Sequence, residues 1–156
     1  MSSRSIKDIV VFGESEGEVR HVRKGPDRWI AGELAITNTL QFASPDGAFT
    51  AGIWESTPGK FRAVYEEDEF YHMLYGQVVI ADEDGNARTF HPGDTIVVPA
   101  GFTGTWEVVE PTKKFYAHYR PGSGPALATA TPVTTEPAER TDADPSDPSD
   151  PSVQAG

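Results

Sequence analysis

Short apolar runs separated by turn residues follow one another between residues 34 and 119. About eight such runs are predicted strands, at residues 34–42, 49–55, 70–75, 77–81, 88–90, 95–98, 105–109 and 113–119. Ser44–Gly47, Asp84–Asn86 and Pro92–Asp94 carry turn chemistry, since proline presets φ and glycine adopts positive φ. Regular turns without a helical period are typical of an antiparallel sandwich or barrel. The pattern therefore predicts an all-β fold.

The two ends of the chain depart from this pattern. Residues 1–32 are interrupted by glycines and Pro26, and they predict an N-terminal arm with at most one short strand, packed on the barrel or on a second subunit. Residues 121–156 are rich in proline, lack aromatic residues and contain a DPSDPSDPS repeat. Such a segment buries too little apolar surface to offset its ordering entropy. We therefore expect a barrel at 33–120, followed by a disordered tail that serves as a solubilising or spacer segment rather than a binding segment.

Composition excludes several classes of function. A net charge of −11 over 156 residues argues against binding to nucleic acid or to an anionic membrane surface. The chain has no cysteine, which excludes disulfides and thiolate metal sites. The N-terminal apolar run at residues 9–12 is too short for a signal-peptide core or a membrane span. We therefore expect a cytoplasmic protein with a small-molecule partner.

A set of spaced motifs carries a family resemblance. Gly59, Glu69-x6-Gly76, Pro92-Gly93-Asp94 and Pro99-x-Gly101 resemble, in order, the two signature motifs of the cupin superfamily. The surrounding sequence, over roughly residues 30–120, is similar to that of small single-domain cupins grouped with ethanolamine-utilisation and ureidoglycine-aminohydrolase-like proteins. The resemblance implies a cupin-type double-stranded β-helix, a jelly-roll barrel that commonly forms homodimers through the N-terminal arm and a sheet edge. It does not identify a reaction, because one scaffold hosts many activities.

The resemblance also implies a metal held by three histidines and a glutamate. Only Glu69 matches that pattern, because residues 62–67 contain no histidine and Gly104 occupies the second-motif position. Divalent first-row metals prefer imidazole nitrogen or several converging carboxylates. We therefore expect no tightly bound transition metal and no cofactor. A metal-dependent enzyme with an atypical carboxylate and tyrosine site at Tyr65, Glu67 and Glu69 remains an alternative.

Strand alternation then predicts the barrel interior. With Glu69 facing inward, as the resemblance implies, the odd-numbered residues from 65 to 73 share its face, and an inward Gly104 brings Trp106 inward as well. Glycine at 104 is expected to open space that Trp106 partly refills. The residues expected at the site are Trp54, Arg62, Tyr65, Glu67, Glu69, Tyr71, Met73 and Trp106. His72 is expected on the opposite face, and the phase of His118 stays open.

The predicted interior combines a carboxylate with aromatic walls. In an apolar pocket, desolvation raises the pKa of a carboxyl group, which makes Glu69 a candidate general acid and base. Tyr65 and Glu67 would orient it, while Trp54, Arg62, Tyr71, Met73 and Trp106 would bind substrate. We therefore favour an isomerase, lyase, hydrolase or deaminase that acts on a small polar metabolite. Aromatic faces beside a carboxylate also suit an amine.

Two other interpretations of the interior stay open. One is a non-catalytic cupin that binds or senses a small metabolite. In the other, the aromatic side chains simply fill a small barrel while Glu67 and Glu69 lie at its rim in water.

Overall fold

The computed structural model describes residues 3–121 and contains nine strands over that range. The elements are η1 (Ile6–Asp8), β1 (Glu18–Val22), β2 (Trp29–Gly32), β3 (Ile36–Ala43), β4 (Phe49–Ser56), β5 (Gly59–Val64), β6 (Asp68–Asp82), β7 (Ala87–Phe90), β8 (Thr95–Val98) and β9 (Thr103–Tyr119). No helix in this range is long and apolar enough to cross a membrane. Apart from residue 121, the predicted tail lies outside the described residues.

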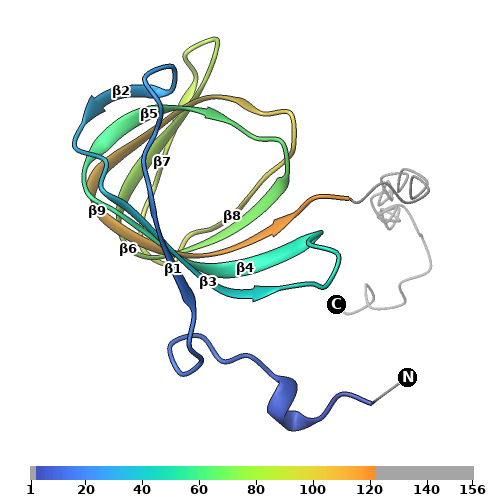
Figure 1. Cartoon of the computed structure of the whole chain (residues 1–156). Coiled ribbons are helices and arrows are strands. Elements are labelled where there is room, and N and C mark those ends of the chain that lie inside the picture. Colours follow the sequence, from blue (N-terminus) through green and yellow to red (C-terminus); the bar gives the residue numbers. More distant parts are fainter. Residues whose placement is uncertain (1–2, 122–156) are drawn as a thin grey trace, which may run out of the picture. The chain divides into compact units, whose positions relative to one another are not determined.

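The strands form one antiparallel sheet that curls into a barrel (Figure 1). Along one path the order is β1-β3-β4-β9-β5-β2, while β6 pairs with β7, β8 and the other side of β9. The turns predicted at residues 44–47, 84–86 and 92–94 all contain a glycine with positive φ. The all-β fold predicted from the spacing of turns is confirmed, and so is the barrel that the resemblance implies.

The two longest strands, β6 and β9, were each predicted as two separate strands. β6 continues through Gly76, whose φ is 90°, with shifts of register on both sides. β9 continues through Pro111, which lies where β9 passes from β5 to β4 and has no ladder partner. Glycine and proline thus mark bulges rather than strand ends here, as both residues commonly do in sheets. β5, where Phe61 and Ala63 alternate with basic residues, was not predicted at all.

The bulge at Gly76 changes which side chains of β6 face inward. Before it the odd-numbered Tyr71 and Met73 are buried, and after it the even-numbered Val78 and Ile80 are. A Cβ atom at Gly76 would overlap the Thr112 hydroxyl and lie 2.5 Å from the Pro111 carbonyl oxygen. Close approach of β6 and β9 therefore requires glycine. In β9, by contrast, even-numbered side chains face inward on both sides of an exposed stretch at residues 109–111.

Gly104 does not open space, contrary to the expectation from sequence. A Cβ atom there would overlap the backbone carbonyl oxygen of Ala81 on β6. Glycine is needed because β6 and β9 approach closely at this point, so a histidine could not stand here without displacing β6.

The N-terminal segment is joined to the barrel at both ends of the sheet. β1 pairs with β3 and β2 pairs with β5, so this segment contributes two strands rather than at most one. Phe12 also packs edge-on against Phe115, with ring centroids 5.4 Å apart. The chain between β1 and β2 is thereby held against the open end of the barrel.

Candidate functional site

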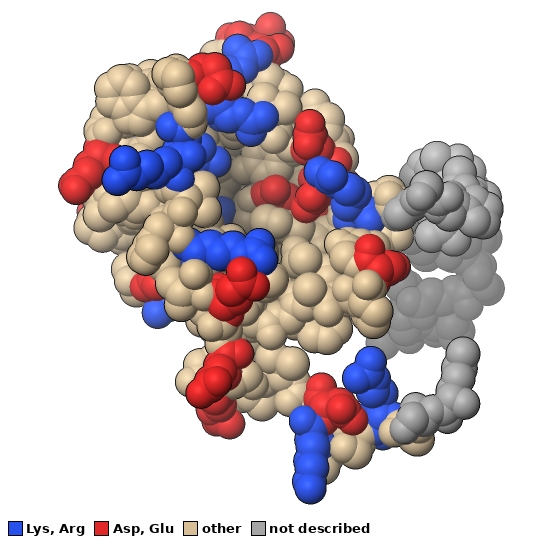
Figure 2. Space-filling model, viewed as in Figure 1, with Lys and Arg blue, Asp and Glu red and all other residues tan. Residues whose placement is uncertain are grey.

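A cavity of about 180 Å³ lies inside the barrel and opens to solvent on the face seen in Figure 2. Basic and acidic side chains both gather around its opening. Six of the residues predicted for the site line it: Trp54, Arg62, Tyr65, Glu69, Tyr71 and Trp106. Met73 is fully buried in the core below it, and Glu67 lies at the rim.

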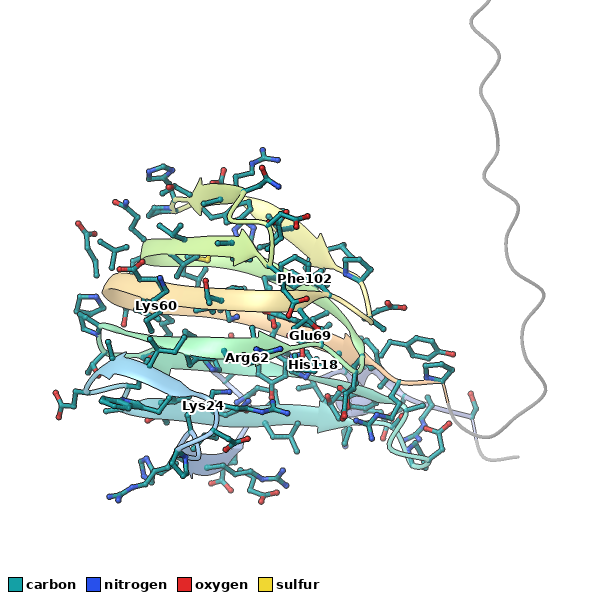
Figure 3. The ribbon with its side chains drawn as sticks, turned by 90° about the horizontal axis from the view of Figure 1, so that it is seen from above. Lys24, Lys60, Arg62, Glu69, Phe102 and His118 are labelled. Atoms are coloured by element: carbon teal, nitrogen blue, oxygen red, sulfur yellow. The ribbon has the colours of Figure 1, made fainter. Side chains whose placement is uncertain are left out.

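Strand register brings the polar groups of the cavity together. In the β6–β9 ladder Glu69 lies opposite His118, Tyr71 opposite Tyr116, and Met73 opposite Lys114. Side chains directly opposite each other in an antiparallel pair are close neighbours on one face. Glu69 and His118 therefore lie side by side (Figure 3), with Glu69 Oε2 3.6 Å from His118 Nε2.

Glu69 is the buried carboxyl group of the cavity, with a side chain 17% exposed. Burial raises its pKa to about 7, and the nearby Glu67 carboxylate adds to this effect, while Lys114 and Lys24 oppose it. Burial has the largest effect because a desolvated carboxylate loses the water that stabilises its charge. Glu69 therefore exchanges a proton near neutral pH, as a general acid and base must.

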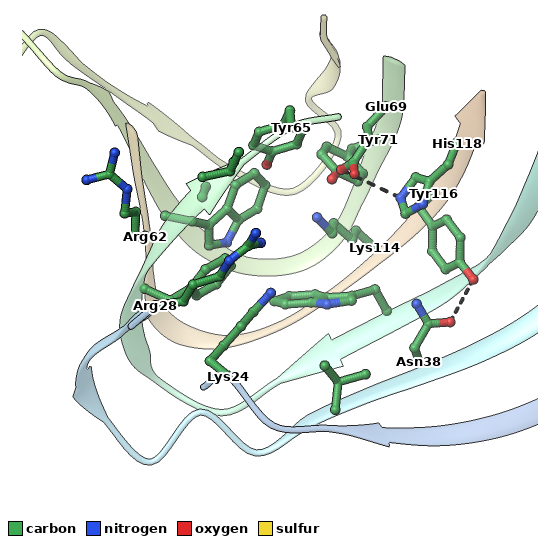
Figure 4. A pocket seen from close by; sticks show the side chains of 16 residues that line it. Lys24, Arg28, Asn38, Arg62, Tyr65, Glu69, Tyr71, Lys114, Tyr116 and His118 are labelled. Carbon is green, nitrogen blue, oxygen red and sulfur yellow. Dashed lines mark hydrogen bonds and ion pairs between the residues drawn. The ribbon is translucent and has the colours of Figure 1, made fainter. Parts of the chain in front are cut away.

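Lys114 projects from β9 into the centre of the cavity (Figure 4). It is 3% exposed, and its Nζ atom lies 3.2 Å from the centroid of the Tyr71 ring, 4.0 Å from that of Trp106 and 4.5 Å from that of Trp54. Burial lowers the pKa of Lys114 well below its usual range, although Glu69 opposes that shift. The aromatic faces of the cavity thus enclose an amine that belongs to the protein.

His118 connects the buried carboxyl group to the rim. Its Nδ1 atom lies 3.6 Å from Glu67 Oε2, while Glu67 Oε1 lies 3.1 Å from Arg120 Nη2. Burial, together with the positive charge of Lys114, lowers the pKa of His118 to about 4. The imidazole is therefore neutral at pH 7 and can both accept and donate a proton.

The N-terminal segment supplies the basic side of the cavity. Lys24 and Arg28 line it and reach toward Lys114 from the chain between β1 and β2 (Figure 4). Lys24 Nζ lies 4.3 Å from the centroid of the Phe61 ring, and burial followed by the charge of Arg28 lowers its pKa. The backbone N–H of Arg62 donates to the Arg28 carbonyl over 2.7 Å, which fixes this segment to β5.

Two tyrosines complete the polar lining. Burial raises the pKa of Tyr65 well above its usual range, so Tyr65 presents a neutral hydroxyl group. The Pro99–Gly101 turn holds the main chain at Tyr65, because the Gly101 N–H donates to the Tyr65 carbonyl over 2.7 Å. Tyr116 donates its hydroxyl proton to Asn38 Oδ1 over 2.6 Å.

Comparison with known proteins identifies the family. The family model described as the EutQ-like cupin domain matches residues 43–116. The fold is similar to that of the EutQ protein of Clostridium difficile (18% identity, TM-score 0.50), over 56% of this chain and 64% of that chain. It is also similar to a putative ethanolamine utilization protein Q from Salmonella typhimurium (20% identity, TM-score 0.50), over 55% and 69% of the two chains. The chain is a member of the cupin superfamily. Within it, this cupin resembles the EutQ-like branch.

A third solved structure, a protein of unknown function from Pseudomonas syringae, resembles this cupin more closely in shape. The TM-score is 0.59 at 24% identity, over 65% of this chain and 44% of that one. A search of curated proteins gave no match. This cupin covers about two thirds of the two EutQ chains, and at these identities the likeness establishes the fold alone.

The residues of this cupin do not fit a tightly held divalent metal. Between residues 3 and 121, the possible ligands that converge are Glu67, Glu69 and His118, with ligand atoms within 4.8 Å of one another. Glu67 is already paired with Arg120, whose Nη2 atom lies 3.1 Å from Glu67 Oε1. Lys24 and Arg28 add positive charge to the same cavity. One imidazole and at most one free carboxylate fall short of the donor set that such ions prefer.

Six polar residues of the cavity lining were missed from the sequence: Lys24, Arg28, Asn38, Lys114, Tyr116 and His118. Lys114, Tyr116 and His118 share the even-numbered phase of Trp106, so alternation continued through Pro111 would have identified them. Lys24 gave only the signal of a short basic run before the turn at Gly25 and Pro26, and Arg28, which follows that turn, gave none. His72, as predicted, faces away from Glu69, and its Nδ1 atom lies 2.8 Å from the Thr95 hydroxyl.

Proposed function

We propose that this cupin binds a small anionic metabolite in the barrel cavity and moves a proton to or from it with Glu69. The observation that carries the proposal is a buried Glu69 with a pKa of about 7 in a cavity open to solvent. A group that is half ionised near neutral pH is suited to general acid and base catalysis. Isomerisation, elimination and hydrolysis all need such a group.

The charge of the cavity favours an anion over an amine. Lys24, Arg28, Arg62 and Lys114 line it, against the single carboxyl group of Glu69. Arg62 is already paired with Glu83, but Arg28 has no ion pair with another described residue. The aromatic faces that would attract an ammonium ligand already surround Lys114. A carboxylate on the ligand would therefore find its partners in Arg28 and Lys24.

The size of the cavity restricts the ligand to a small metabolite. A volume of about 180 Å³ corresponds to roughly six water molecules at their share of the liquid volume. Drug-sized ligands occupy cavities of about 300–1,000 Å³. A carboxylic acid of a few carbon atoms fits, whereas a nucleotide does not.

His118 and Tyr65 would assist Glu69 in this proton transfer. The neutral imidazole lies between Glu69 in the cavity and Glu67 at the rim, and therefore offers a route by which Glu69 exchanges its proton with solvent. Both gaps are 3.6 Å, longer than a direct hydrogen bond, so the imidazole must rotate or a water must bridge them. Tyr65, whose hydroxyl stays protonated, would donate a hydrogen bond to the ligand.

The test uses acetate, malonate and pyruvate as anionic probes and ethylamine as a cationic probe. We expect calorimetry to detect binding of at least one carboxylate and none of the amine. In D2O, NMR should then show protein-dependent exchange of the C–H protons next to the carboxyl or carbonyl group. Binding without exchange would favour the non-catalytic alternative. Preference for ethylamine, or no binding of any carboxylate, would contradict the proposed function.

We also propose that the cupin forms a homodimer through its N-terminal segment. Ile6, Ile9, Val19, Trp29 and Ile30 all leave large apolar side chains exposed there, between 45% and 80%. A second copy of the chain would cover this surface. Light scattering that gives the mass of a single chain at micromolar concentration would contradict the dimer.

A further inference from the structure

Lys114 has the surroundings of a nucleophilic amine rather than of a structural lysine. Among residues 3–121 no hydrogen-bond acceptor or carboxylate lies within bonding distance of its Nζ atom, which is instead enclosed by Tyr71, Trp106 and Trp54. Even so, Lys114 lines the cavity that Glu69 and His118 share. Its amine therefore faces the same ligand space as the acid and base.

Two opposing effects set the charge of this amine. Contact with aromatic faces favours the ammonium form. Removing an ammonium group from water without a carboxylate within bonding distance disfavours that form more strongly. Desolvation is the larger effect, and this agrees with the lowered pKa of Lys114. The shift favours the unprotonated amine, whose lone pair is the nucleophile when a lysine attacks a carbonyl carbon.

We propose that Lys114 forms an imine with the carbonyl carbon of a small oxo acid bound in the barrel cavity. This inference rests on the proposed function, since it requires the cavity to bind a small carboxylate, and it narrows the substrate class to carbonyl compounds. The carboxylate of the oxo acid would lie against Arg28 and Lys24, and its carbonyl carbon would face Lys114 Nζ between the aromatic rings.

The chemistry balances with the groups that the cavity holds. The Nζ lone pair forms the C–N bond, the carbonyl π pair moves to oxygen, and a proton passes from nitrogen to that oxygen to give a carbinolamine. The C–O bond then breaks, and the departing hydroxyl takes the proton of Glu69 to leave as water. A protonated imine on Lys114 and a carboxylate on Glu69 remain, with no oxidation or reduction. Glu69 is then the base that can remove a C–H proton acidified by the imine.

Borohydride trapping tests the inference with pyruvate as the probe. The full-length protein is incubated with pyruvate, reduced with sodium borohydride and analysed by intact mass and peptide mapping. We expect one reduced pyruvate adduct per chain, located on Lys114. Lys114→Arg keeps the positive charge but should abolish the adduct, whereas Lys113→Arg, one residue away on the outer face, should leave it unchanged.

The outcomes separate the imine from the function on which it depends. No adduct, or adducts spread over Lys113 and other surface lysines, would overturn the imine. If calorimetry nevertheless detects pyruvate binding that is lost in Arg28→Ala, the proposed anion site stands without covalent chemistry. If no carboxylate binds, both proposals fail. Peptide mapping of the unaltered protein decides the case even if Lys114→Arg does not fold.

Discussion

Replacing Glu69 with glutamine is expected to slow C–H exchange of a bound carboxylate by about 100- to 10,000-fold, the usual contribution of a positioned acid or base. Glutamine keeps the shape of the side chain but cannot take up or release a proton near neutral pH. Affinity for the ligand should change little, because Arg28 and Lys24 rather than Glu69 would hold its carboxylate. NMR exchange rates and calorimetric affinities measured on the same samples give the two values.

Glu67→Gln is the matched control for this substitution. Glu67 lies at the rim and does not line the cavity, so its replacement should reduce the exchange rate much less than replacement of Glu69. Equal losses in the two variants, or a loss of affinity without a loss of exchange rate, would contradict the role of Glu69 as acid and base.

The same substitution should change how stability depends on pH. The pKa of Glu69 is about 7 in the fold against an ordinary value of 4.5, so its contribution to stability is full below pH 4.5 and is lost as pH rises through 7. Glutamine does not titrate, and the variant should therefore gain up to about 3 kcal/mol relative to the natural protein across that range. His118 contributes in the opposite sense, but it is present in both proteins. Urea titrations at several pH values measure the difference.

Replacing Lys114 with methionine is expected to make the protein more stable while abolishing imine formation. Methionine fills a similar volume and packs well against aromatic rings. It also removes a buried polar group that has no hydrogen-bond partner among the described residues, and burial of such a group costs about 1–3 kcal/mol in proteins. Since Lys114 lowers the pKa of Glu69, that pKa should rise above 7 in the variant. A residue that lowers the stability of the protein is commonly retained where function requires it, and Lys114 lies in the cavity.

Lys113→Met is the control, because Lys113 lies on the outer face of the same strand with its side chain 32% exposed. Its ion pair with Glu55 is partly exposed, so its replacement should change stability by less than about 1 kcal/mol. Urea unfolding of the two variants at pH 7 makes the comparison. If Lys114→Met loses more stability than Lys113→Met, Lys114 stabilises the fold, and the prediction is wrong.

Much of this fold could be predicted from the sequence, because its turns depend on local chemistry. Gly47, Gly85 and Gly93 all adopt positive φ where a turn was predicted. The inward phase of the residues around Glu69 followed from alternation. What failed was the assumption that Gly76 and Pro111 end strands. Both are bulges, tolerated because β6 and β9 cross between partners there, and such long-range pairing leaves no local signal.

The residues of the candidate site likewise divide into those that local pattern predicts and those that depend on long-range strand pairing. Glu69 was placed inward by the resemblance to cupins, and Tyr71 and Trp106 followed from alternation along one strand at a time. Lys114 and His118 were missed because β9 was divided at Pro111, which broke the count of alternating positions. Lys24 and Arg28 were beyond prediction, since their place at the cavity depends on the pairing of β1 with β3 and of β2 with β5.

The barrel encloses a carboxyl group, Glu69, whose pKa is raised by burial, and an amine, Lys114, whose pKa is lowered by burial. NMR titration of the Glu69 carboxyl carbon and the Lys114 Nζ nitrogen measures this directly, with Glu69→Gln and Lys114→Met to assign the signals. We predict that Glu69 titrates with a pKa of about 7 and that Lys114 titrates well below its ordinary value of 10.5. A pKa of 4.5 for Glu69 together with 10.5 for Lys114 would contradict the account.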